Sequence, residues 1–190
     1  MSNFTKKEIT QTFINLCEKK SYEKITVKEI VEEAGISKQT FYNHFIDKYD
    51  LMEYTYARHT KEMAKLVTQT NKGKFSEYNI IVQTLNYFYK YKKYFASLLR
   101  QTSANEFLTS MYISNRAWFS ECVKHKKHVN TLNYHENQII DFYAAGAITL
   151  TRKWILNDMT EPVEEFAEEL FELLNYMLDA LNLPVVVCCA

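Results

Sequence analysis

The residues best suited to chemistry lie together in the stretch SKQTFYNHF, residues 37–45. It places hydroxyl, amide, imidazole and ammonium side chains around two phenylalanines, Phe41 and Phe45. At roughly 100° per residue on a helix, the phenylalanines share one side, while Gln39 and Asn43 point away from them. A helix anchored by rings and displaying hydrogen-bonding groups has the chemistry needed to recognise base edges in DNA.

The side chains of this region divide into two candidate roles. Amides pair with base edges, so Gln39 and Asn43 are candidate base readers, together with Lys38 and Thr40. Phosphate oxygens accept hydrogen bonds from hydroxyl, imidazole and ammonium groups, and helix N-termini attract anions. The candidate phosphate ligands are therefore Thr26, Ser37, Tyr42, His44 and Lys48.

Three short helices are expected to position these groups. Residues 5–20 carry apolar side chains at helical spacing, Thr26 opens a capping-box pattern, and Ser37 can cap a third helix. Gly35 separates the second and third helices and suits a left-handed turn. The pattern predicts a helix-turn-helix whose second helix enters the major groove.

The composition of the whole chain favours an all-α fold. Its 190 residues include only 3 glycines and 2 prolines, while 47% are hydrophobic and 15% aromatic. Sheet proteins and disordered chains use more turn residues. We expect about nine helices, in a DNA-binding domain over residues 1–47 and a larger helical domain over residues 48–190. Beyond residue 47, helices are expected over 48–72, 77–100, 106–124, 135–157 and 162–182.

Charge and cysteine content restrict the function classes. The formal net charge is zero, so DNA binding has to rest on a local patch. The chain has no secretory signal, no apolar run of membrane-spanning length and no disulfide pattern, which indicates a cytoplasmic protein. The apolar tail VVVCCA is open to three interpretations: a frayed end, a partner contact or an added segment.

A catalytic centre is not expected. The sequence offers no convincing nucleophile–base pair or paired carboxylates, and we expect no enzyme activity, no cofactor and no metal. Cys122, His125 and His128 form C-x2-H-x2-H, a set of zinc-capable ligands. Because the spacing is not that of a standard structural site and lysines surround it, a solvated basic loop is preferred, with a zinc-responsive regulator as the alternative.

The stretch ITVKEIVEEAGISKQTFYNHFIDKYDLM, residues 25–52, resembles the DNA-binding motif of the TetR family of bacterial transcriptional regulators. The resemblance implies a homodimer that binds a palindromic operator on double-stranded DNA, commonly a repressor released by a small-molecule effector. Asn43 stands where many relatives have tyrosine, so no operator sequence is implied. The matching residues are Thr26, Ala34, Gly35, Ser37, Phe41, Tyr42, His44, Phe45, Lys48 and Leu51.

A second, looser resemblance covers residues 142–174, FYAAGAITLTRKWILNDMTEPVEEFAEELFELL. This stretch is similar to a TetR subgroup that includes regulators resembling the activator of dihydroxyacetone kinase operons. The resemblance implies an alternative function, an activator or co-regulator switched by a partner protein.

Two sets of residues are candidates for sites in the C-terminal domain. Apolar stripes on the last two helices predict a dimer interface, or else belong to the chain's own core. Aromatic and apolar residues on several helices predict an effector pocket, or else simple core. The interface set is Tyr143, Gly146, Leu150, Trp154, Ala167, Leu170, Leu174 and Met177. The pocket set is Leu85, Phe88, Phe95, Leu99, Phe107, Met111, Trp118 and Phe142.

Overall fold

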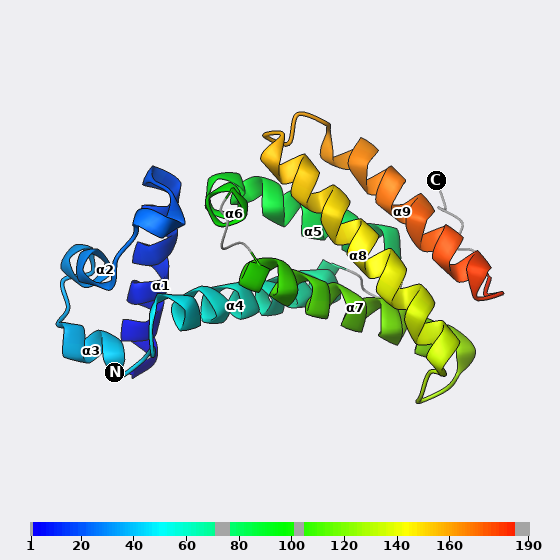
Figure 1. Ribbon diagram of the computed structural model, residues 1–190, viewed down its shortest axis with the longest axis horizontal. Coiled ribbons are helices and arrows are strands. Elements are labelled where there is room, and N and C mark those ends of the chain that lie inside the picture. Colours follow the sequence, from blue (N-terminus) through cyan, green and yellow to red (C-terminus); the bar gives the residue numbers. More distant parts are fainter. Residues whose placement is uncertain (1, 71–76, 101–104, 185–190) are drawn as a thin grey trace.

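The structure is a computed structural model in which residues 2–70, 77–100 and 105–184 are described, apart from the side chains of residues 2, 3, 60, 62–70 and 106. Every regular element in these ranges is helical, with nine α-helices and one 3-10 turn, which confirms the predicted all-α fold (Figure 1). None of the described helices is both long and apolar enough to cross a membrane. The VVVCCA tail lies outside the described residues.

The N-terminal helices form a small unit at one end of the molecule (Figure 1). Their order follows the prediction, with a 3-10 turn added between the first two helices. α1 packs against α2, and α2 against α3. The elements are α1 (Ser2–Lys19), η1 (Tyr22–Lys24), α2 (Val27–Glu33) and α3 (Lys38–Tyr42).

The long helix α4 (Lys48–Thr70) leads from this unit into a larger bundle. α8 packs against α7 on one side and α9 on the other, while α9 also covers α5. A capping box at Asn133 and Glu136 fixes the start of α8. The remaining elements are α5 (Glu77–Lys90), α6 (Lys92–Leu99), α7 (Asn105–Lys127), α8 (Tyr134–Leu156) and α9 (Val163–Ala180).

The helix expected over residues 77–100 is two helices, which corrects the sequence-based prediction. The chain turns at Tyr91, whose φ and ψ are −110° and 31°. The amide of Tyr91 still donates to the carbonyl of Tyr87 at 3.3 Å, so hydrogen bonding continues through the turn. The turn lets α6 pack on α1 and bury Tyr94 and Phe95 completely. Burial of two rings outweighs the helical preference of this segment.

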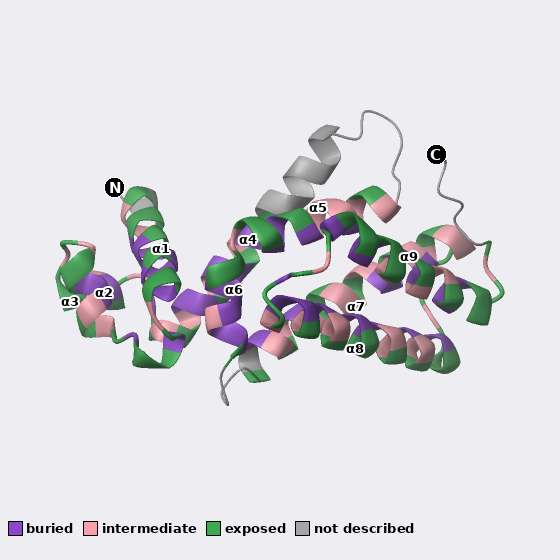
Figure 2. Cartoon of the chain, turned by 90° about the horizontal axis from the view of Figure 1, so that it is seen from above, coloured by how far each residue is buried: buried purple, intermediate pink, exposed green. Residues whose placement is uncertain are grey.

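Buried residues run through the interior of both parts (Figure 2). In the N-terminal unit, Phe13, Phe41 and Phe45 are 0%, 0% and 2% exposed. In the bundle, Phe95 and Phe107 are 0% and 1% exposed, and their rings stack 6.1 Å apart. One hydrophobic cluster spans both parts. Because a packed interior transmits strain, displacement of a bundle helix can shift the N-terminal helices.

Candidate DNA-binding surface

The inner side of α3 is held by the two phenylalanines that the sequence predicted. The rings of Phe41 and Phe45 lie 5.7 Å apart, and Phe45 meets the ring of Tyr54 on α4 at 5.4 Å. The ammonium of Lys6 on α1 lies 4.5 Å from the Tyr54 ring centroid. A five-residue helix is too short to be stable alone, so these contacts with its neighbours fix its orientation.

Side-chain caps begin α2 and α3, as predicted. The hydroxyl of Thr26 accepts from the amide of Glu29 at 3.3 Å. The hydroxyl of Ser37 accepts from the amide of Thr40 at 3.0 Å and lies 2.8 Å from the Thr40 hydroxyl. Each cap satisfies a backbone donor that the helix itself leaves unpaired.

Gly35 forms the turn between α2 and α3. Its φ is +64°, in the left-handed region that glycine adopts without strain. The amide of Ile36 then donates back to the carbonyl of Val31 at 3.0 Å, which closes the end of α2. This turn sets the angle at which α3 leaves α2.

The outer side of α3 presents the candidate base readers to solvent. Lys38, Gln39 and Asn43 are exposed, and Thr40 is half-buried beside its cap. The Gln39 amide donates to the Asn43 side-chain carbonyl at 3.1 Å. An exposed, mutually ordered pair of amides on a rigid helix matches the chemistry of base-edge recognition.

The candidate phosphate ligands surround this face. Tyr42 is 54% exposed and packs edge-on against Phe41 with ring centroids 5.5 Å apart. Ser37 and Thr26 are exposed, whereas His44 is half-buried. The hydroxyl of Thr26 uses a lone pair for its cap, so its proton stays available to a phosphate oxygen.

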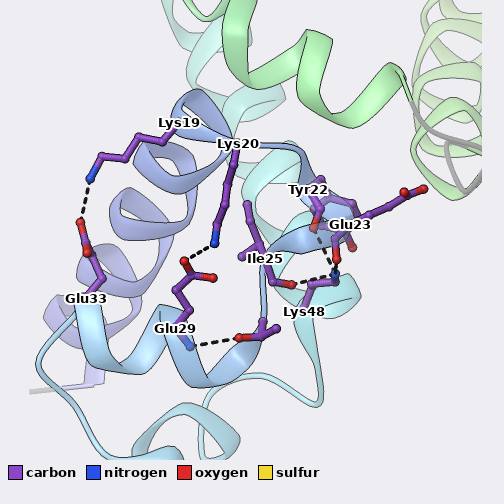
Figure 3. A network of polar contacts seen from close by, with 9 residues as sticks. Lys19, Lys20, Tyr22, Glu23, Ile25, Glu29, Glu33 and Lys48 are labelled. Carbon is purple, nitrogen blue, oxygen red and sulfur yellow. Dashed lines mark hydrogen bonds and ion pairs between the residues drawn. The ribbon is translucent and has the colours of Figure 1, made fainter.

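Lys48 has a structural role that the sequence did not suggest. Its ammonium donates to the carbonyl oxygens of Tyr22, Glu23 and Ile25 at 3.1, 3.3 and 2.9 Å (Figure 3). It also lies 4.5 Å from the Tyr22 ring centroid. An ammonium has three donors, so all of them serve the η1 segment, and burial lowers the pKa of Lys48. Direct phosphate binding by Lys48 would require one of these bonds to open.

Two ion pairs connect α2 with the end of α1 and the residue that follows it. Lys19 pairs with Glu33 at 2.9 Å, and Lys20 pairs with Glu29 (Figure 3). The hydrogen bond from Lys20 is the main reason why the pKa of the Glu29 carboxyl is lowered. These two lysines neutralise acids of their own domain, whereas Lys38 is exposed on the outer side of α3.

Ser97 on α6 is a contact residue that the sequence analysis missed. Its hydroxyl donates to the carbonyl of Lys20 at 3.1 Å and accepts from the amide of Tyr22 at 3.0 Å. The segment around η1 is therefore held by α6 on one side and by Lys48 of α4 on the other. No sequence pattern pairs two segments separated by more than seventy residues, so only the fold identifies this joint.

The predicted effector residues mostly form tightly packed core. Leu85, Phe88, Phe95, Leu99, Phe107 and Met111 are buried and Trp118 is half-buried. Phe142 is 75% exposed, so its assignment to a pocket was wrong, because it lies on the outward side of α8. Two surface grooves of about 390 Å³ each are present, and other residues line them.

Half of the predicted dimer residues belong to the chain's own core. Trp154, Ala167, Leu174 and Met177 are at most 4% exposed, which corrects their assignment to an interface. Trp154 stacks on Phe166 at 5.0 Å. These four residues face inward because α8 and α9 pack on each other and on α5, α6 and α7. The other four interface residues lie at or near the surface: Gly146 is exposed, and Tyr143, Leu150 and Leu170 are half-buried.

The zinc-capable residues do not assemble into a site. Among the described residues, no group of three or more His, Cys, Asp or Glu side chains is arranged to hold a metal ion. Burial raises the pKa of the Cys122 thiol to about 12, which disfavours the thiolate that zinc binds. The imidazoles of His125 and His128 are exposed, with ring centroids 6.4 Å apart.

Comparison with known proteins gives two family matches. Residues 9–55 match a family described as bacterial regulatory proteins, tetR family. Residues 76–176, more than half of the chain, match a family described as transcriptional regulator C-terminal region (TetR_C_8).

A curated relative, the HTH-type transcriptional regulator YvkB of Bacillus subtilis strain 168, is 33% identical over 66 residues. That match spans only 35% of this chain and 35% of the relative.

Solved structures share the fold over nearly the whole chain. The dihydroxyacetone kinase operon activator DhaS has a TM-score of 0.65 and 22% identity, covering 93% of this chain and 97% of its own. SmeT, the repressor of a Stenotrophomonas maltophilia multidrug efflux pump, has a TM-score of 0.65 and 12% identity, covering 97% and 94%. At these identities the likeness establishes the common architecture.

Proposed function

The chain belongs to the tetR family of bacterial regulatory proteins, which are non-enzymatic DNA-binding transcription regulators, and from that premise we propose a homodimeric cytoplasmic repressor released by a small-molecule effector. Its α3 helix reads a palindromic operator in the major groove. The observation that carries this proposal is the division of α3 into two sides. Phe41 and Phe45 are buried, while Gln39 and Asn43 are exposed and hydrogen-bonded to each other.

We assign recognition of DNA bases to α3, and contacts with the phosphates of the DNA backbone to the residues around it. Gln39 and Asn43 have the groups needed to pair with base edges, ideally adenine. Lys38 can bind guanine or phosphate, and Thr40 stands at the leading end beside its cap. Tyr42, His44, Ser37 and Thr26 are proposed phosphate ligands. Lys48 is proposed to act mainly by holding η1, which fixes the start of α2.

A homodimer is proposed through the outward faces of α8 and α9. On α8 this face carries Phe142, 75% exposed, beside Gly146, where an added Cβ would meet nothing within 4 Å. On α9 it carries Tyr176, 58% exposed. Exposed rings beside a glycine suit close approach of a second copy. A two-fold dimer places two α3 helices on two half-sites of one palindrome.

We propose that α6 transmits effector binding to the N-terminal DNA-binding unit. Ser97 ties α6 to the carbonyl of Lys20 and the amide of Tyr22, while Tyr94 meets Phe13 of α1 with ring centroids 6.1 Å apart. A ligand that favours one position of α6 would therefore bias the orientation of the N-terminal unit. Only a ligand that binds the two arrangements with different affinity can produce this switch.

The proposed function is tested by selecting DNA bound by the purified protein from a genomic library of its source organism. We expect one palindromic motif, bound by a dimer with a steep loss of affinity as salt rises. A folded dimer that enriches no sequence would contradict the proposal. The matched variant Gln39→Ala should keep the fold and relax preference at one base pair of each half-site.

An activator or a partner-switched co-regulator is the second candidate, favoured by the similarity of residues 142–174 to regulators of the DhaS type. In vitro transcription from the selected promoter separates the two: a repressor lowers transcript yield and an activator raises it. Co-purification of a second protein that alters DNA binding would support the partner-switched form.

A further inference from the structure

A groove between α7 and α8 contains Arg152, whose Nε atom has no hydrogen-bond partner among the described residues. The groove has a volume of about 390 Å³ and is lined by Asn105, Leu108, Thr109, Tyr112, Ala145, Ile148, Thr149 and Arg152. This volume is in the range of small-molecule sites. We propose that the groove binds a small monocarboxylate with an apolar chain, whose carboxylate pairs with Arg152.

Arg152 differs from the other arginines at its Nε atom, for which the described residues supply no hydrogen-bond partner. Arg116 pairs with Asp141, Arg100 pairs with Asp158 at 2.9 Å, and Arg58 also has an interaction. Within the described ranges, the Nε atom of Arg152 is buried without a hydrogen-bond acceptor. A buried donor left unpaired costs free energy comparable to a lost hydrogen bond. An anionic ligand in the groove would supply the missing acceptor.

The polar groups of the groove favour an anion at one end. Contacts between Arg116 and Asn137, and between Tyr112 and Asp141, show that α7 and α8 run antiparallel. Arg152, near the end of α8, therefore lies at the same end as Asn105, the first residue of α7. The N-terminus of α7 adds positive potential there, and the C-terminus of α8 adds negative potential at the same end, so the guanidinium of Arg152 is the group that favours an anion. The carboxylate of Asp141, farther along, is already paired with Arg116, so it does not neutralise Arg152.

The middle of the groove is apolar. Leu108 and Ile148 are half-buried, Ala145 adds a methyl group, and the hydroxyl of Tyr112 is turned to Asp141. The hydroxyls of Thr109 and Thr149 donate to carbonyls of their own helices at 2.7 and 2.8 Å. Because those protons are used, the middle offers few donors and suits a hydrocarbon chain. A guanidinium pairs with a planar carboxylate through two parallel hydrogen bonds, which favours a carboxylate head.

This inference deepens the proposed function, on which it rests for its biological meaning, by giving the effector a location and a chemical class. Its test needs no DNA. Octanoate is titrated calorimetrically into the purified full-length protein, with 1-octanol as the neutral analogue and inorganic phosphate as the head group alone. We expect saturable binding of one octanoate per chain, with 1-octanol weaker by about tenfold or more because it lacks the charge.

Two variants and one matched control locate the binding. Arg152→Gln should weaken octanoate binding about tenfold or more, and Ala145→Glu should do the same by placing a like charge in the groove. Lys153→Gln removes the same charge at the neighbouring exposed residue and should change affinity by less than about twofold. Circular dichroism and light scattering check that each variant keeps its fold and oligomeric state.

Several outcomes would overturn the inference. Equal affinity for octanoate and 1-octanol would remove the role of the carboxylate, and so would unchanged binding by Arg152→Gln. If octanoate does not bind the parent and Arg152→Gln dissociates the dimer, Arg152 serves an interface between copies. Each of these results leaves operator selection untouched, so failure here is distinct from failure of the proposed function.

Discussion

The short helix α3 and the long helices α8 and α9 differ in which of their apolar residues are buried and in what covers them. At α3 and just after it, Phe41 and Phe45 define one inner side, while the polar residues Lys38, Gln39 and Asn43 on the other side are exposed. On α8 and α9, half of the apolar residues that suggested an interface lie inside the chain's own bundle, with Trp154 and Met177 at most 4% exposed. Periodicity locates an apolar stripe but does not say which neighbour covers it.

The largest expected effect tests this difference with one substitution made in two places. Phe41→Ala removes a ring that is 0% exposed and should destabilise the protein by about 3–5 kcal/mol, with loss of operator binding. Phe142→Ala removes a ring that is 75% exposed and should change monomer stability by less than about 0.5 kcal/mol. Urea unfolding gives both values. Equal losses of stability in the two variants would show that burial does not distinguish Phe41 from Phe142.

The next effect separates the two roles of Lys48. Lys48→Met removes a hydrogen bond from each of three carbonyl groups, of which that of Tyr22 still accepts from the amide of Ile25, and should lower the free energy of unfolding by about 1–3 kcal/mol. DNA affinity should fall on every sequence alike. Lys38→Met, at an exposed position, should weaken DNA binding without changing stability. Unchanged stability of Lys48→Met would favour a phosphate ligand over a positioning residue.

A smaller effect tests the joint between α6 and the N-terminal unit. Ser97→Ala removes the two hydrogen bonds to Lys20 and Tyr22 and should cost about 1–2 kcal/mol. Ser120→Ala is the matched control, because the Ser120 hydroxyl is buried without a partner among the described residues and has no bond to lose. Thermal unfolding compares the variants. Similar shifts for both would mean that the Ser97 bonds contribute little.

The smallest effect concerns Gly146 in the middle of α8. Gly146→Ala adds a methyl group into open space and should stabilise the isolated chain by roughly 0.5–1 kcal/mol, because glycine weakens a helix interior. If two copies approach closely at this face, the same change should weaken the dimer. Sedimentation at several concentrations measures the second effect, and a dimer unaffected by the added methyl would place the interface elsewhere.

Sequence reasoning succeeded where the determinants are local. The caps at Thr26 and Ser37, the left-handed Gly35 and the inward Phe41 each depend on residues within one turn. It failed where distant segments compete for the same surface. The break at Tyr91 follows from the packing of α6 on α1. The contacts of Lys48 and Ser97 join residues far apart in the chain, and no periodicity encodes them.

If Gln39 and Asn43 read bases as proposed, the hydrogen bond between them affects how the protein can acquire a new operator. The bond limits the rotamers of both amides, so replacing either residue also releases the other. The effect of a second substitution then depends on whether the first is present, which is epistasis between two positions one turn apart. A protein that acquires a new target sequence by single substitutions would pass through an intermediate in which one of these two amides has lost its partner. Divergence at residues 39 and 43 is therefore expected to occur by paired replacements.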